Sequence, residues 1–176
     1  MNLYSLHKDP KSLHNNEQAY EVVPSLIAHQ FEDPDFSPTK KQTEAILKSP
    51  FLSYEYAVEV LDYSRFLPGE QIISTNPKYA LRYAMTVLKK RFHAGEKAIA
   101  STSMTAVDYA IHVIKGRWLQ GEKVIAKSHA HSMRYSIHAV KGKWPPGEEA
   151  ISSNSYTTNT YNTMLKDKGY GEDELI

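Results

Sequence analysis

The sequence predicts an all-α protein, a right-handed α-solenoid of about four to five helix-turn-helix repeats with an N-terminal helical cap. The first supporting observation is a Gly-Glu dipeptide that recurs at one fixed interval, at 69–70, 95–96, 121–122 and 147–148. The second is a helical apolar pattern inside each interval. This 26-residue period is too long for a heptad and lies in the range of helical repeat arrays. Because one helix pair cannot bury its apolar faces alone, neighbouring repeats must stack.

The second repeat shows the predicted unit most clearly. Asn76 suits the N-cap and Pro77 the first helical position, since proline needs no N–H there. Five apolar or small residues follow at helical spacing on one face: Ala80, Tyr83, Ala84, Val87 and Leu88. Gly95 then ends the connection, and residues 96–100 predict a second, shorter helix. The unit is a longer helix, a turn, a short helix and a return turn.

The other repeats follow this template at the same positions. The predicted N-caps are Ser49, Asn76, Thr102, Ser128 and Asn154, and the central aromatic residues are Tyr56, Tyr83, Tyr109, Tyr135 and Tyr161. Each long helix is predicted to end with a cation and an aromatic residue: Arg65-Phe66, Arg91-Phe92, Arg117-Trp118 and Lys143-Trp144. The Gly-Glu carboxylate lies five positions after each cation, which predicts a ladder of ion pairs near helix C-termini. The central tyrosines could stack nucleic-acid bases, but a buried position between repeats is the favoured interpretation.

The chain is predicted to form one domain with three parts. These are an N-terminal segment and cap (1–44), the repeat array (45–152), and a degenerate last repeat with an acidic tail (153–176). Ser37-Pro38 predicts the start of a helix that runs to about Leu47, and residues 15–31 also have a helical pattern. In the last repeat Asn162 and Lys166 replace apolar residues, which predicts a terminal cap.

Charge is distributed unevenly along the chain. The segment 77–144 contains 13 basic and 3 acidic residues, a balance of +10, which leaves 8 basic and 17 acidic residues elsewhere, a balance of −9. Outward positions at i, i+4 and i+7 share one helical face, so stacking aligns them into a strip. The candidate binding residues are Arg82, Lys89, Lys90, His112, Lys115, Arg134, His138 and Lys141. The strip could hold phosphates or an acidic protein surface; the alternatives are internal charge complementarity and a solvated face.

Other kinds of site have little support in the sequence. There is no cysteine, which excludes disulfides and thiolate sites. His129 and His131 diverge on a helix and no carboxylate is in register with them, so no metal site is expected. No nucleophile–base motif or Gly-rich phosphate loop is present, so neither catalytic residues nor a cofactor are expected; a histidine such as His112 acting as a general base is the residual enzyme alternative. No apolar run approaches the roughly 20 residues that span a bilayer, so we expect no membrane partner and a cytoplasmic protein.

The repeat signature, seen at 83–99, 109–125 and 135–151, resembles tandem repeats in uncharacterised proteins of large tailed bacteriophages. The resemblance covers residues 45–152 and includes no catalytic residues. It implies a phage-encoded accessory protein that acts in the cytoplasm of the infected bacterium. We therefore expect a non-enzymatic interaction protein that inhibits or redirects a host defence protein with an acidic surface. The alternative is an anion-binding module for nucleic acid or a nucleotide, with Trp118 and Trp144 as candidate aromatic walls.

Overall fold

The structure is a computed structural model that describes residues 38–176, and this part of the chain is helical with no β-strand. Five long helices begin with these α-helical stretches: α3 (Pro50–Glu55), α5 (Pro77–Arg82), α7 (Ser103–Tyr109), α9 (His129–Tyr135) and α11 (Ser155–Asp167). Each of the first four continues into a π-helical stretch that belongs to the same long helix: η2 (Tyr56–Val60), η4 (Tyr83–Leu88), η6 (Ala110–Ile114) and η7 (Ser136–Val140). The shorter helices are α2 (Lys40–Ile46), α4 (Glu70–Ile73), α6 (Glu96–Ile99), α8 (Leu119–Ile125) and α10 (Pro145–Ser152). Single 3₁₀ turns form η3 (Leu67–Gly69), η5 (His93–Gly95) and η8 (Glu172–Glu174). The all-helical prediction is confirmed.

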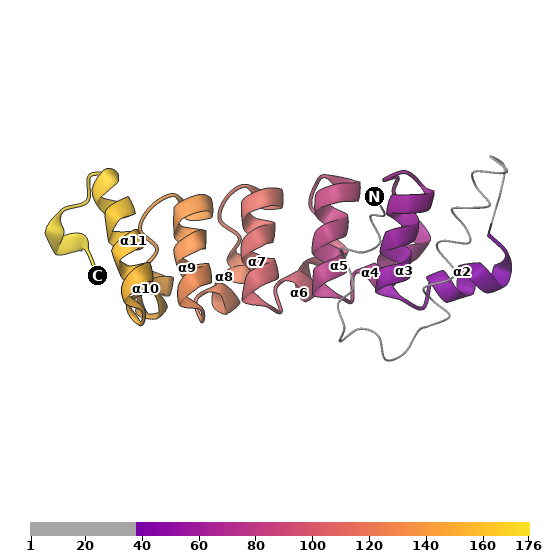
Figure 1. The fold of residues 1–176 in the computed structure, drawn as a ribbon, viewed down its shortest axis with the longest axis horizontal. Helices are drawn as coiled ribbons and strands as arrows, with labels where there is room; N and C mark the ends of the chain where they lie inside the picture. The colour runs from indigo at the N-terminus through magenta and orange to yellow at the C-terminus, as the bar shows by residue number, and fades with distance from the viewer. Residues whose placement is uncertain (1–37) are drawn as a thin grey trace, which may run out of the picture.

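The long helices stand side by side in a row, with the short helices along the lower edge of the view (Figure 1). Each long helix contacts the next one in the chain: α3 with α5, α5 with α7, α7 with α9, and α9 with α11. Each short helix from α4 onward also packs against the long helix that precedes it, as α8 does against α7, while α2 packs against α3, which follows it. The fold therefore alternates a long and a short helix, and its contacts run between neighbours in sequence.

The predicted N-caps begin the long helices, because this signal is local. Ser49, Asn76, Thr102, Ser128 and Asn154 each accept a hydrogen bond from a free backbone N–H two or three positions on. The helix before the array differs from its prediction. Its N-cap is Thr39, which forms a capping box with Gln42, so α2 begins after Ser37-Pro38 rather than at it. Ser37 itself and the predicted helix at 15–31 lie outside the described residues.

The long helices end earlier than predicted, and the reason is a wide final turn. In η4 the N–H of Lys89 bonds to the carbonyl of Ala84, five positions back, and the N–H of Lys90 bonds to the same carbonyl at 3.2 Å. Lys89, Lys115 and Lys141 then adopt the left-handed conformation, with φ of 51°, 60° and 60°, which ends the helix. The cation–aromatic pairs, such as Arg91-Phe92, therefore lie beyond the helix and not in its last turn.

The glycine of the Gly-Glu dipeptide ends the connection in two repeats, because Gly69 and Gly95 are the N-caps of α4 and α6, as predicted for Gly95. In the next two repeats the glycine lies inside the short helix. Gly121 is in the first turn of α8, and Gly147 is in that of α10. A β-carbon at Gly121 would lie 2.6 Å from the Trp118 ring and 3.1 Å from the Ala106 β-carbon. Only glycine lets the aromatic ring pack this closely against the short helix at this point. The recurring glycine is therefore required for close packing.

Two columns of residues fill the core between repeats. The isoleucines at the ends of the short helices are fully buried, as are the central tyrosines of the later four repeats. The isoleucines are Ile73, Ile99, Ile125 and Ile151, and the tyrosines are Tyr83, Tyr109, Tyr135 and Tyr161. The predicted buried position of the tyrosines is confirmed.

Candidate functional site

The buried tyrosine hydroxyls tie each repeat to the one before it. The Tyr109 hydroxyl accepts a hydrogen bond from the Phe92 N–H at 2.9 Å and donates one to Glu96 Oε1 at 2.9 Å. Two nitrogens of the Arg91 side chain donate hydrogen bonds to the same carboxylate, at 2.8 Å and 3.0 Å. Burial raises the pKa of Tyr109 to about 12. Burial alone would raise the pKa of Glu96, but the hydrogen bonds and charge of its partners outweigh it and leave that pKa lowered.

The same arrangement recurs along the row. Tyr83, Tyr135 and Tyr161 donate to Glu70, Glu122 and Glu148 in turn. The fourth repeat differs in its cation, because Lys143 donates to the Glu174 carbonyl at 2.7 Å instead of to the carboxylate. These tyrosines are enclosed and paired, so they offer no face on which a base could stack. The columns of tyrosine, glutamate and cation side chains therefore have a structural role.

The predicted binding residues divide into two sets. Lys89, Lys115 and Lys141, which we call the lysine row, lie exposed at the C-terminal ends of three consecutive long helices. None of them makes an ion pair with another residue of 38–176. Lys90, His112 and His138 are also exposed beside the row. The row and these neighbours are free to meet a partner.

Arg82 and Arg134 belong to a different column, which alternates in charge. Successive repeats carry Glu55, Arg82, Asp108 and Arg134 at this position, and all four are partly buried. Arg134 donates to Asp108 Oδ1 at 2.8 Å across one repeat boundary. At this position internal charge complementarity is the interpretation that fits. The prediction did not separate the two sets, because the pairing depends on a residue one full repeat away.

Four of the predicted residues meet around one hollow of about 470 Å³ between the ends of η4 and η6. They are Lys89, Lys90, His112 and Lys115. Arg91 adds a further cation, although its own partner is Glu96. Ala84, Met85 and Val113 also line the hollow and give it an apolar part. This hollow is therefore lined mainly by cations and lies at the boundary between two repeats.

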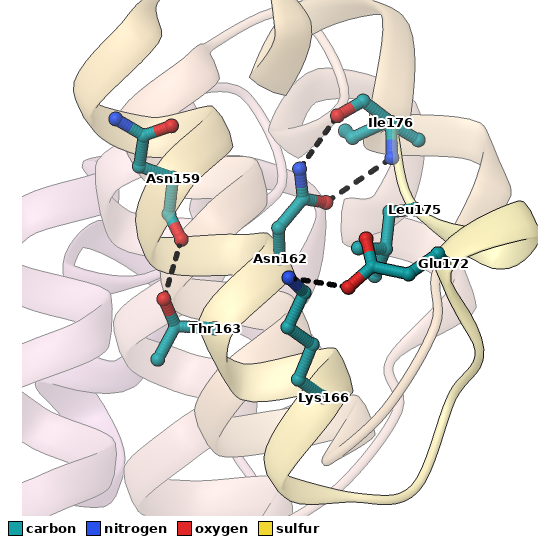
Figure 2. A pocket seen from close by; sticks show the side chains of 7 residues that line it. All are labelled: Asn159, Asn162, Thr163, Lys166, Glu172, Leu175 and Ile176. Carbon is teal, nitrogen blue, oxygen red and sulfur yellow. Dashed lines mark hydrogen bonds and ion pairs between the residues drawn. The ribbon is translucent and has the colours of Figure 1, made fainter.

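A second hollow, of about 580 Å³, lies between α11 and the segment 172–176 (Figure 2). The Asn162 amide donates to the Ile176 carbonyl at 2.6 Å and accepts from the Ile176 N–H at 3.1 Å. Lys166 pairs with Glu172 at 2.7 Å. Asn162 and Lys166 are the two polar residues that make the last repeat degenerate, and each holds this segment against α11. The replacement of apolar residues at these positions therefore has a structural reason.

One polar contact was missed from the sequence. The Ser103 hydroxyl lies 2.8 Å from His131 Nδ1, and the two residues come from neighbouring repeats. Burial, and to a smaller extent the Arg134 charge, lowers the pKa of His131. No sequence motif marks this pair, since its members lie in different helices and far apart in the chain. Its location at two helix N-termini makes it a further contact between repeats.

Residues 38–176 were searched for metal-binding groups and for helices that could span a membrane. The described residues contain no group of three His, Asp or Glu side chains arranged to hold a metal ion. None of the described helices has the length and apolar character that a bilayer crossing requires.

Comparison with known proteins adds no relative. No protein-family model, curated protein or solved structure matches the chain. The described residues therefore form an all-helical protein with an exposed basic edge.

Proposed function

We propose that this chain is a non-enzymatic α-solenoid scaffold that binds an acidic surface of a partner protein through the lysine row. The observation that carries the proposal is the backbone conformation of the three lysines. A residue with a β-carbon costs about 1–2 kcal/mol in the left-handed region, where glycine is usual. Glycine directly follows two of these lysines, as Gly116 and Gly142. A lysine kept at this position in three consecutive repeats is best explained by what its side chain binds.

The charges around the row support the same conclusion. Arg134 pairs within the stack, whereas the row lysines have no acidic partner in residues 38–176. Exposed cations that recur in every inner repeat raise the local potential and attract acidic surfaces. The resemblance to phage repeats suggests that the partner belongs to the host. The partner would be a bacterial protein, such as a defence factor, that the scaffold inhibits or redirects in the cytoplasm.

The hollow between η4 and η6 favours a second candidate, an anion-binding module. The five cationic or imidazole side chains around this hollow could hold a phosphate of a nucleotide or nucleic acid. The predicted aromatic walls do not support this alternative. Trp118 is 3% exposed and Trp144 is 1% exposed, so neither ring is open to a base.

A capture experiment with matched charge reversals separates these functions. The tagged chain is incubated with bacterial lysate, and the eluate is analysed for protein and for nucleotides. The row variant carries Lys89→Glu, Lys115→Glu and Lys141→Glu. The control carries Lys97→Glu, Lys123→Glu and Lys127→Glu, which make the same charge change at exposed sites elsewhere.

We expect one stoichiometric protein that the row variant loses and the control retains. Bound nucleotide or nucleic acid, lost in the same variant, would replace the proposal with the anion-binding function. Equal retention by both variants would mean that the row does not bind the partner.

A further inference from the structure

We propose that the segment bound by the lysine row is an α-helix with three acidic residues about seven positions apart and a basic residue at each end of that series. This inference rests on the proposed function and specifies the partner's form. It follows from the charges at one repeated position and from the spacing of packed helices.

The repeated position has a symmetric charge pattern. It lies 13 residues after the N-cap of each long helix, and the first repeat has one extra residue beyond it. Asp62 occupies this position in the first repeat and Asp167 in the last, so the series reads Asp62, Lys89, Lys115, Lys141 and Asp167. All five side chains are exposed. They belong to the C-terminal ends of the long helices, along the upper edge of Figure 1. Asp62 shares the left-handed conformation, with φ of 46°. The charge at this one position is therefore positive in the middle of the series and negative at both ends.

The spacing along this edge favours a helix as the occupant. Consecutive long helices are in direct contact, and packed helix axes lie roughly 8–10 Å apart. Seven residues of an α-helix advance about 10.5 Å and return to the same face with a drift of only about 20°. A helix lying along the row can thus present one side chain to each repeat.

Other acidic ligands match this edge less well. Same-face residues of an extended strand are about 6.6–6.8 Å apart, and a DNA duplex carries one phosphate charge per roughly 1.7 Å of its axis. Most of those charges would fall between the lysines. A long polyanion would also meet Asp62 and Asp167, which repel it.

The hollow between the second and third repeats gives the middle of this surface its local shape. Met85, 37% exposed, supplies an apolar part against which the methylene groups of a glutamate can pack. Lys89, His112 and Lys115 surround it and can donate to the carboxylate. One repeat further, the equivalent residues are Ile111, Lys115, His138 and Lys141. Lys115 therefore serves both positions and is the central residue of the surface.

The test measures binding of synthetic helical peptides to the full chain by fluorescence anisotropy at low salt. The matched peptide carries Lys, Glu, Glu, Glu and Lys at seven-residue intervals in an Ala/Gln helix. A scrambled peptide has the same composition with the three Glu consecutive, and an all-acid peptide has five Glu at the same intervals. We expect the matched peptide to bind at least about tenfold more tightly than the scrambled one, the sum of several surface ion pairs. Lys115→Glu should weaken it by about the same factor.

Reversal of the two end charges gives the sharpest result. The double variant Asp62→Lys with Asp167→Lys should bind the matched peptide more weakly and the all-acid peptide more tightly. A surface that ignores pattern would bind every net-acidic peptide more tightly after this change, and that result would overturn the inference. Equal affinity for the matched and scrambled peptides, or equally strong binding of a short single-stranded DNA, would overturn it too.

The two proposals fail in different experiments. If the lysate partner depends on the lysine row but the peptides show no preference for the matched pattern, the scaffold function stands and the helical-partner inference is wrong. If the lysate partner is indifferent to the row, the proposed function itself fails.

Discussion

The hydroxyl of each central tyrosine is the smallest unit that joins two repeats. In Tyr109 it satisfies the Phe92 N–H, which would otherwise be buried without a partner, and it also orders the Glu96 carboxylate. That carboxylate in turn fixes Arg91. One hydroxyl therefore sets the path of the chain after the lysine turn and the orientation of the short helix.

We expect Tyr109→Phe to lower the free energy of unfolding by about 1–3 kcal/mol, because it leaves the Phe92 N–H buried and unpaired. Tyr109→Ala should cost more, about 3–5 kcal/mol, since it also leaves a cavity. Urea unfolding followed by circular dichroism measures both. Tyr156→Phe is the control: Tyr156 is 71% exposed, so its change should be near zero. A Tyr109→Phe midpoint equal to that of the control would contradict the role assigned to the hydroxyl.

Replacing a left-handed lysine with glycine should not lower stability, although the same substitution inside a helix usually does. We expect Lys115→Gly to leave stability unchanged or raise it by about 1 kcal/mol, since relief of the β-carbon clash outweighs the lost interaction with the helix end. Lys123→Gly, inside α8, should cost about 1 kcal/mol. Thermal unfolding of the two variants compares the same substitution in two conformations. A larger loss for Lys115→Gly would mean that the lysine is retained for stability, and the proposed function would lose its main support.

At the scale of the element, α11 is held in place by the segment that follows it. Asn162 makes both of its hydrogen bonds to the backbone of residue 176, and Lys143 bonds to the Glu174 carbonyl. Leu175 and Ile176 pack against the apolar cluster around Tyr161. Residues 170–176 thus cover an apolar face of α11 that a stacked helix covers in the earlier repeats.

We expect Asn162→Ala to release this segment from α11, because the two backbone groups of residue 176 lose their partners. Hydrogen exchange should become faster over residues 170–176, with a loss of about 1–2 kcal/mol in global stability. Asn159→Ala is the matched control, since Asn159 is exposed on the same helix. Unchanged exchange in Asn162→Ala would show that the apolar contacts alone hold the segment.

The contact between α7 and α9 should make the fold sensitive to acid. The pKa of His131 is lowered, first by burial, then by Arg134 and more weakly by His129, while Asp108 opposes the shift. The unfolded chain therefore binds a proton at this residue more readily than the folded chain does, and stability falls as pH drops from about 7 toward 5. Urea unfolding at several pH values should show this slope reduced in His131→Gln. An identical slope in the variant would assign the effect to other groups.

At the scale of the whole molecule, contacts run between neighbours in the row, which makes stability local. In the proposed solenoid a defect at one end should reach the other end only weakly. We expect Tyr161→Ala to speed native-state hydrogen exchange in α9, α10 and α11 while α3 keeps its protection. Tyr83→Ala, near the other end, should show the reverse distribution. Equal loss of protection along the whole chain after either change would indicate a single cooperative unit instead.

From the sequence alone we could predict the repeat period, the N-caps of the long helices and the buried column of tyrosines. These features are readable because they depend on helix periodicity and on contacts within a single helical turn. The residues at which the long helices end could not be predicted from the sequence. Whether a helix closes with a wide π turn at Lys89, or continues to Arg91, depends on how the following segment packs.

The candidate site was predicted only in part, for the same reason. The lysine row and Arg134 look alike in the sequence, but only the tertiary structure sets Arg134 against Asp108 and leaves the row without a described partner. Likewise Asn162 breaks the apolar repeat pattern in the sequence, and only its hydrogen bonds to residue 176 in the structure explain why. Periodicity determines which residues share a face; the contacts between side chains far apart in the sequence decide which of them remain free to bind.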